Sequence, residues 1–334
     1  MSTIKDVARV AGVGVGTVSR VLNNYPGVSP ETRTRVTNVI AQLHYKPNPI
    51  ARSMISKRTD AIGVIVPFFT HPFQIEILQS IQVALARAEK ELILYNVETP
   101  TQRDHYFSEV PMHQKVDGLL IVSLSPTEIF LARLHENDLP TVLVDAYSPQ
   151  LHSLVVDNMD GSYQAVKFLI EKGHQRIGFI NGIRDDHFTF NQANDRLIGF
   201  HRAMSEANLI FDPDLLIATA WKRQDAQKAA QQLLQHHERP TAIFAASDVQ
   251  ASGVLEAARI LHLKIPEELS VMGFDGIELS EVLGLSTVQQ PIQQMGKLGV
   301  DILIEQINGI PGEPKLIRLP THLIERRTTG PLHI

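Results

Sequence analysis

The 334-residue sequence contains no cysteine, which excludes disulfides, thiolate nucleophiles and cysteine–zinc sites. It has no apolar run of the roughly 18–20 residues that a membrane-spanning helix requires, and its first residues lack the apolar stretch of a secretory signal. We therefore expect a cytoplasmic protein that does not engage a membrane. Aromatic residues make up 6% of the chain, with one tryptophan, Trp221, so each aromatic side chain near a pocket matters. The length suits two or three domains.

Acidic residues are scarce at the N-terminus. Residues 1–58 contain nine Lys and Arg against two acidic residues, a net charge of +7, whereas the remainder contains 22 against 34, a net charge of −12. A small basic module followed by an acidic body favours a polyanionic partner for the module alone. A basic, solvated surface is the alternative interpretation, because short segments often drift in charge.

Residues 1–46 show the pattern of three short helices. Thr3 can cap the first helix, which ends at the glycine-containing turn 12–14. A second helix runs from Val15 to about Asn23, and the Ser-Pro-Glu sequence at 29–31 starts a third. Two short helices joined by a tight turn form a helix-turn-helix, whose second helix enters the major groove of DNA.

The outward face of this second helix suits DNA. Thr17, Ser19 and Asn23 are short polar residues that can bond phosphate oxygens. Arg20 is placed to donate two hydrogen bonds to a guanine. For the hydroxyl residues, an ordinary solvated helix surface is the alternative.

Several motifs of the segment form a specific series. They are Thr3-Ile4-Lys5-Asp6-Val7-Ala8, Ala11-Gly12-Val13, Thr17-Val18-Ser19-Arg20-Val21-Leu22-Asn23, Val28-Ser29-Pro30-Glu31-Thr32-Arg33 and Tyr45-Lys46-Pro47-Asn48 with Ala51-Arg52-Ser53. With these motifs, the segment resembles the headpiece of the lactose/galactose repressor (LacI/GalR) family of bacterial regulators. The resemblance extends over nearly the whole chain and implies an allosteric, operator-binding protein.

The sequence departs from the family pattern at three positions. Gly14 stands where the family usually has a capping serine, and glycine is a slightly weaker cap. Val15 and Gly16 stand where the family usually recognises bases. Gly16 has no side chain for this and Val15 offers only apolar contact, so direct base recognition depends on Arg20.

Residues 47–60 are predicted to form a conditional hinge. Asn48 can cap a helix and Pro49 suits its first position, but the two turns that follow are too short to be stable alone. The resemblance implies that this helix folds in the dimer on DNA and inserts an apolar side chain, here Met54, into the minor groove. A plain basic linker is the alternative. The predicted DNA contacts are Thr3, Val15, Gly16, Thr17, Ser19, Arg20, Asn23, Ala51 and Met54.

The remainder alternates apolar strand patterns with helical patterns. The expected strands are Ala61–Val66, Leu92–Val97, Gly118–Val122, Thr141–Val144, Leu154–Val156, Arg176–Ile180, Ala242–Ala245 and Ser270–Phe274. This alternation predicts doubly wound parallel sheets covered by helices, and the length requires two such lobes. The fold class is therefore an all-α helix-turn-helix headpiece followed by an α/β two-lobed sensor, which by resemblance is similar to periplasmic sugar-binding proteins.

By the same resemblance, the chain crosses between lobes near 157–160, 287–291 and 319–321. The predicted domains are the headpiece 1–46, the hinge 47–60, a first lobe of 61–158 with 290–319, and a second lobe of 159–289 with 320–330.

Several polar residues follow predicted strands, where the ligands of such folds bind. Asp145, Asp275 and the pair Ser247-Asp248 come at strand ends, and Arg196 lies in Asp195-Arg196-Leu197-Ile198-Gly199-Phe200, a segment that matches the family. Carboxylates accept hydrogen bonds from hydroxyl groups, and a guanidinium group donates two parallel hydrogen bonds. The set therefore suits a polyhydroxylated ligand. The alternatives are helix caps for the acids, preferred for Asp248, and an ion pair across the lobes for Arg196.

Aromatic residues complete the predicted ligand site. By resemblance, Trp221 matches a tryptophan that stacks on a sugar, Phe73 falls in the cleft-lining segment after the first strand, and Ser247 replaces a common asparagine. A core or surface role is the alternative for Trp221, and Phe188 and Phe190 are weaker candidates. The predicted effector contacts are Phe73, Asp145, Arg196, Trp221, Ser247 and Asp275.

Catalytic patterns are not apparent. The adjacent pair His236-His237 lacks metal-ligand spacing, and neither a Gly-x-Ser-x-Gly nor a His-Glu-x-x-His motif occurs. We expect no cofactor, no metal ion and no enzyme activity. Two acids in a cleft can also perform acid–base chemistry, but ligand binding fits better beside a DNA-binding module.

We therefore predict a homodimeric repressor of carbohydrate-utilisation genes that recognises a pseudo-palindromic operator on double-stranded DNA. A bound sugar closes the cleft, changes the dimer contacts and releases the DNA. The sequence ends without the leucine heptads that form tetramers in the lactose repressor, so we expect dimers. The alternatives are a family regulator that responds to a purine or to a phosphoprotein, and a sugar-binding protein without DNA-linked regulation.

Overall fold

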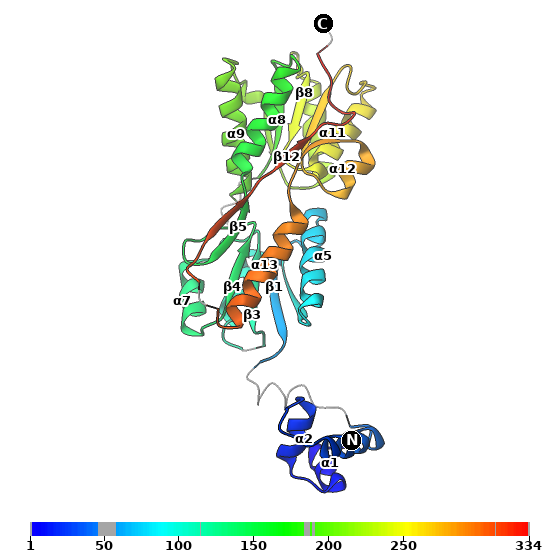
Figure 1. Ribbon diagram of the computed structural model, residues 1–334. Coiled ribbons are helices and arrows are strands. Elements are labelled where there is room, and N and C mark those ends of the chain that lie inside the picture. The colour runs from blue at the N-terminus through cyan, green and yellow to red at the C-terminus, as the bar shows by residue number, and fades with distance from the viewer. Residues whose placement is uncertain are drawn as a thin grey trace. The chain divides into compact units, whose positions relative to one another are not determined.

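The computed structural model describes residues 2–45, 58–113, 115–183, 188, 191–310 and 312–332. The chain divides into two compact units, Met1–Thr59 and Asp60–Ile334 (Figure 1). Most of the predicted hinge, with Ala51 and Met54, lies outside the described residues, as does Phe190.

The first unit contains three helices, α1 Ile4–Ala11, α2 Val15–Leu22 and α3 Pro30–Gln42. Thr3 and Asp6 form a capping box at the start of α1, and Gly12 ends this helix with a left-handed φ of 65°. The side chain of Ser29 caps α3. One apolar core joins the helices through Val7, Ala8, Ala11, Val18, Val21, Val36 and Val39. The predicted helix-turn-helix is confirmed.

The second unit contains two six-stranded sheets. The first has the order β11-β5-β4-β3-β1-β2, and all of its pairs are parallel. Its strands are β1 Ala61–Pro67, β2 Glu91–Val97, β3 Gly118–Val122, β4 Thr141–Val144, β5 His152–Val156 and β11 Leu316–Leu319.

The second sheet has the order β12-β10-β9-β8-β6-β7. It is parallel except where β12 runs antiparallel to β10. Its strands are β6 Ile177–Gly182, β7 Leu216–Thr219, β8 Ala242–Ala245, β9 Ser270–Asp275, β10 Ser286–Gln289 and β12 His322–Ile324.

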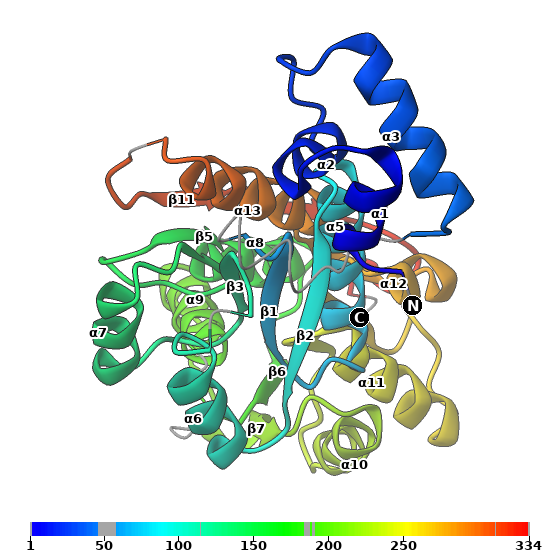
Figure 2. The ribbon, with the colours of Figure 1, turned by 90° about the horizontal axis from the view of Figure 1, so that it is seen from below.

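Helices cover both faces of each sheet. In the first lobe, α5 Pro72–Arg87 and α13 Ile292–Ile307 cover one face, and α6 Pro100–Glu109 and α7 Glu128–Glu136 the other (Figure 2). The second lobe places α8 Asn158–Glu171 and α9 Gln192–Glu206 on one face, and α10 Arg223–Leu234 and α11 Asp248–Ile260 on the other. A short 3-10 helix, Pro213–Leu215, precedes β7, and α12 Glu278–Leu283 follows β9.

The strand sequences explain this layering. Alternate residues of β1 point to opposite faces, so Ile62, Val64 and Val66 join the core under α5 and α13, whereas Ile65 joins the core under α6 and α7. Strands buried on both faces have nearly continuous apolar sequences. The predicted two-lobed α/β fold is confirmed.

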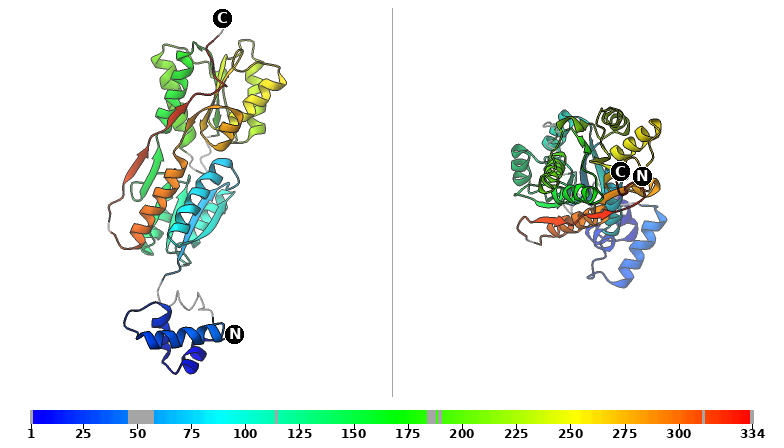
Figure 3. Two further views of the ribbon diagram at one scale, coloured as in Figure 1. Left: turned by 45° about the vertical axis from the view of Figure 1, so that its right-hand side comes forward. Right: turned by 90° about the horizontal axis from the view of Figure 1, so that it is seen from above.

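The chain passes between the lobes in three places, after β5, after β10 and between β11 and β12. The last of these crossings is visible along the C-terminal strands in Figure 3. Within the described ranges, no helix combines the length and apolarity that spanning a membrane would need.

Candidate functional site

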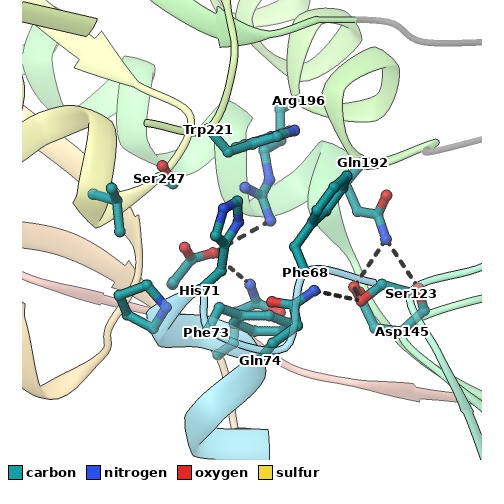
Figure 4. Close-up of a pocket in the computed structure, with 14 residues that line it drawn as sticks. Phe68, His71, Phe73, Gln74, Ser123, Asp145, Gln192, Arg196, Trp221 and Ser247 are labelled. Carbon is teal, nitrogen blue, oxygen red and sulfur yellow. Dashed lines mark hydrogen bonds and ion pairs between the residues drawn. The ribbon is translucent and has the colours of Figure 1, made fainter. Parts of the chain in front are cut away.

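One cavity of the second unit lies between its two lobes. Its empty space, about 620 Å³, includes space that is open to solvent. The strand ends of both sheets meet here, as expected for open parallel sheets. Six lining residues are the predicted effector contacts, Phe73, Asp145, Arg196, Trp221, Ser247 and Asp275 (Figure 4).

Asp145 follows β4 and has a left-handed φ of 58°. Its carboxylate accepts hydrogen bonds from Oγ of Ser123 at 2.7 Å and from Nε2 of Gln192 at 2.8 Å. Asp145 therefore joins the two lobes and does not cap a helix. Burial raises the pKa of Asp145, although these hydrogen bonds and the charge of Arg196 oppose the rise.

Arg196 points from α9 into the cavity and is buried. Its Nε donates to Oδ1 of Asn158 at 2.9 Å, and Nη1 donates to the carbonyl of Ala246. Nη2 lies 3.6 Å from Oδ1 of Asp275, which belongs to the same lobe. The ion pair between Arg196 and Asp275 therefore lies within one lobe. It is not the ion pair across the lobes that was the alternative role for Arg196. The guanidinium carbon also lies 3.7 Å from the centroid of the Phe274 ring.

Asp275 ends β9 with an unusual φ of 113° and is buried. Its Oδ1 accepts from Nε2 of Gln290 at 2.8 Å. Burial raises the pKa of Asp275 to about 7, although the charge of Arg196 lowers it. Among the described residues, Oε1 of Gln290 is buried without a hydrogen-bond donor. Gln290 is itself one of the residues that line the cavity.

The predicted role of Asp248 as a helix cap is wrong. Ser247 caps α11 instead, since its Oγ accepts from the backbone N–H of Gln250 at 3.1 Å. Oδ2 of Asp248 accepts from the N–H groups of Gly276 at 2.7 Å and Ile277 at 3.0 Å. Asp248 therefore fixes the turn that follows Asp275. Burial and the nearby Asp275 raise the pKa of Asp248 well above its usual value.

Trp221 and Phe73 lie on opposite sides of the cavity (Figure 4). The indole packs directly on Gly182, where a Cβ would overlap with the ring. This close approach holds the ring at the cavity wall, where it can cover the C–H face of a ligand. Phe188, a weaker candidate, is buried and packs against Phe68 with ring centroids 5.4 Å apart.

Sequence reasoning missed other lining residues, namely Phe68, Gln74, Ser123, Gln192, Val249 and Gln290. Ser123 follows β3 and could have been found by the rule that identified Asp145. The glutamines give no such signal, because this residue type is most often a solvated surface residue.

The predicted DNA contacts lie in the first unit. Val15, Gly16, Arg20 and Asn23 are exposed, as is Thr3, whereas Thr17 and Ser19 are half-buried. A Cβ on Gly14 or Gly16 would meet no atom within 4 Å. The guanidinium carbon of Arg20 lies 5.7 Å from the ring centroid of Tyr25. The roles of the predicted residues in both units stay predictions.

No metal centre is evident in the part of the chain that the structure describes, since no three His, Cys, Asp or Glu side chains gather there as a ligand set. The ring centroids of His236 and His237, the adjacent pair noted in the sequence, lie 4.3 Å apart. Nδ1 of His236 is 3.3 Å from the carbonyl oxygen of Glu238.

A helix-turn-helix unit combined with a two-lobed unit that encloses a polar and aromatic cavity defines a ligand-responsive, DNA-binding regulator. Residues 3–48 match the model of the bacterial regulatory proteins of the lacI family, and residues 166–329 match a periplasmic binding protein-like domain. The chain is 32% identical over 337 residues to the HTH-type transcriptional repressor PurR of Aliivibrio salmonicida, covering 99% of this chain and 100% of that protein. The chain belongs to the lacI family of bacterial regulatory proteins, and it is a DNA-binding transcriptional regulator under the control of a small-molecule effector.

Solved structures agree with this assignment. The lac repressor dimer bound to operator and the anti-inducer ONPF superposes with a TM-score of 0.86 at 26% identity, covering 98% of this chain and 99% of that chain. The complex of the transcriptional regulator CelR with cellobiose superposes with a TM-score of 0.72 at 30% identity, covering 98% of this chain and 100% of that chain.

Proposed function

We propose that this regulator is a homodimeric repressor that binds a pseudo-palindromic operator and releases it when a sugar or sugar derivative occupies the cavity between the lobes. Each protomer supplies one helix-turn-helix, and the bound sugar favours the lobe arrangement with the lower operator affinity. A ligand shifts such an equilibrium only by its different affinity for the two states.

The chemistry of the cavity is the observation that supports a sugar. Asp145 and Asp275 offer acceptors, Arg196 offers donors, and Trp221 offers a flat apolar face. A sugar presents hydroxyls that both donate and accept, together with an apolar C–H face. The similar regulator CelR was solved with cellobiose.

A purine is the second candidate. Other branches of the family respond to one, and the whole-length relative of 32% identity is named PurR. The aromatic rings of Trp221 and Phe73 can also hold a planar base between them.

An apolar surface of the first lobe supports the homodimer. Phe69, Ile75, Val83 and Leu94 are exposed along α5 and β2 and in the loop between β1 and α5. Phe69, Ile75 and Leu94 line one shared hollow of this surface, and neighbouring exposed apolar groups favour burial against a partner. We propose a second copy of the chain as that partner, since the similar lac repressor was solved as a dimer on its operator.

We also propose that the cavity binds and does not catalyse. Asp145 and Asp275 already accept hydrogen bonds from Ser123, Gln192 and Gln290, an arrangement that orients a ligand. The regulator then acts in the bacterial cytoplasm, where its operator lies. Incubation with p-nitrophenyl glycosides should release no nitrophenol.

Anisotropy of labelled DNA from upstream of the gene tests the main proposal. The full chain should bind this DNA with an affinity that falls steeply with salt, and a member of a sugar panel should release it. Arg20→Ala should relax the preference for one guanine in each half-site at unchanged salt dependence. Release by hypoxanthine or guanine, with no response to any sugar, would show that the sugar assignment is wrong.

A further inference from the structure

A second hollow lies directly beside the effector cavity, also between the lobes. It encloses about 680 Å³ of space, part of it open to solvent, and is lined by residues of both lobes. Three lining residues, Ser123, Asp145 and Gln192, belong to both hollows. The two spaces are therefore neighbours that share these three residues as lining.

One of these shared residues is Gln192, the first residue of α9. Its Nε2 donates to the carbonyl oxygen of Asp145 at 2.9 Å and to Oδ2 of the same residue at 2.8 Å (Figure 4). A ligand hydroxyl can take the place of the Gln192 amide in both hydrogen bonds, because a hydroxyl also donates to carbonyl and carboxylate oxygens. A ligand held at Asp145 can thus displace the amide and continue into the second hollow.

The second hollow offers groups that the protein itself leaves available. Tyr147 is 49% exposed, and Asp195 and Arg318 also line the space. Within the described ranges, the side chains of these three residues form no hydrogen bond. The second hollow therefore contains an aromatic ring, a carboxyl group and a guanidinium group. The first cavity contains the same three kinds of group, in Trp221, Asp275 and Arg196.

The charges around the second hollow disfavour an anionic ligand. Asp145 and Asp195 line it. Burial raises the pKa of Asp195 and the nearby Asp157 adds to the rise, whereas the charges of Arg196 and Arg318 lower it. Among the described residues, Arg318 is the one basic side chain that lines this space, and its charge already acts on Asp195. The carboxyl groups of Asp145, Asp157 and Asp195 outnumber the two guanidinium groups that act on them, those of Arg196 and Arg318, so a neutral hydroxylated group fits better here than a phosphate.

We propose that the effector is a neutral disaccharide or longer glycoside, with one sugar unit in the cavity beside Trp221 and the next unit in the hollow lined by Tyr147, Asp195 and Arg318. The inference rests on the proposed function, because it names the size and charge of the sugar that the same site binds.

Isothermal titration of the full chain tests the inference with glucose, galactose, fructose, glucose 6-phosphate, cellobiose, lactose, maltose, sucrose and melibiose. One disaccharide should bind at least about tenfold more tightly than its component monosaccharides and than the phosphate. Tyr147→Ala and Arg318→Ala should each weaken this disaccharide by about tenfold and leave monosaccharide binding unchanged. Tyr25→Ala, in the first unit, removes an equally exposed tyrosine and is the matched control.

The outcomes separate the inference from the proposed function. Equal affinities for a disaccharide and its components, tightest binding of glucose 6-phosphate, or unchanged disaccharide affinity in both variants would overturn the inference alone. Equal weakening of mono- and disaccharides by Tyr147→Ala would also overturn it, because the ring would then act on the first sugar unit. Binding of no sugar, together with binding of hypoxanthine or guanine, would overturn the proposed function and the inference with it.

Discussion

At the scale of single residues, two residues of the cavity have backbone conformations of high energy. Asp145 and Asp275 both have left-handed φ values, 58° and 113°, which non-glycine residues rarely adopt. For Asp275, the hydrogen bonds from Gly276 and Ile277 to Asp248 hold the turn in place. Strain of this kind persists where the surroundings fix it, and it is common at binding sites.

The ionisation of Asp275 predicts a pH-dependent stability. Its folded-state pKa of about 7 lies above the usual 3.8, so its contribution to stability is fully present below about pH 4 and is lost as the pH rises through about 7. An amide at this position cannot ionise, so Asp275→Asn should gain thermal stability relative to the parent chain between pH 5 and pH 8. We expect a relative gain of roughly 3–6 °C.

Thermal denaturation of the ligand-free chain at pH 5 and pH 8 measures this difference. Asp214→Asn, at an exposed position, is the control and should show the same difference in melting temperature from the parent at both pH values. A constant difference for Asp275→Asn would mean that the buried carboxyl does not titrate in this range. The variant should also bind sugar more weakly, because an amide nitrogen, which only donates, replaces one oxygen of the carboxyl group.

The candidate site was partly predictable at this scale. Asp145 and Asp275 were identified because parallel strands end at one edge of their sheet. Gln192 and Gln290 were not, because nothing in a single sequence distinguishes a glutamine that bonds a buried carboxyl from one that faces water. The prediction that Asp248 caps α11 failed because Ser247, one residue earlier, is the N-cap of that helix.

At the scale of elements, the pairing of α8 and α9 positions Arg196. Gly199 follows Arg196 by three residues, and a Cβ there would overlap with the carbonyl oxygen of Met159 on α8. The glycine thus permits a close helix contact, one turn from the guanidinium.

Gly199→Ala should therefore force the two helices apart. We expect a loss of about 1–3 kcal/mol in the free energy of unfolding and weaker effector binding, because Arg196 moves with its helix. Urea denaturation and calorimetric titration measure the two effects. Ile198→Ala, at a 42% exposed position of the same helix, should change neither by much. Parent-like stability in Gly199→Ala would show that the helices can separate at little cost.

The strands show where sequence patterns succeed and fail. The eight predicted strands all occur, and β3, β4 and β8 have the predicted bounds. The missed strands include β7, β11 and β12, which are edges of their sheets. Edge strands are half exposed and lack the continuous apolar run of a central strand. β10 was also missed, because its buried Ser286 and Thr287 are satisfied by hydrogen bonds that a sequence does not reveal.

At the scale of the whole molecule, charge and assembly determine function together. The basic residues concentrate in 1–58 and the acidic ones in the remainder, so attraction to DNA is confined to the first unit. One helix-turn-helix covers only one half-site. The proposed pseudo-palindromic operator would therefore need two copies of the chain for high affinity.

Val83→Asp tests the proposed dimer surface. Val83 is 52% exposed on α5, and a charge buried against a second copy is unfavourable. We expect a monomer by sedimentation and a loss of about 100-fold or more in operator affinity. Ile129→Asp, at a 70% exposed position of α7 on the other face of the same lobe, should remain dimeric. A dimeric Val83→Asp would place the interface elsewhere.

Trp221 is the only tryptophan of the chain, and it lines the cavity. Excitation near 295 nm (about the red edge of indole absorption) therefore collects light from that one ring, whose emission depends on the polarity around it. The unlabelled protein is its own fluorescent reporter of occupancy, so a library of compounds can be screened before any operator is known.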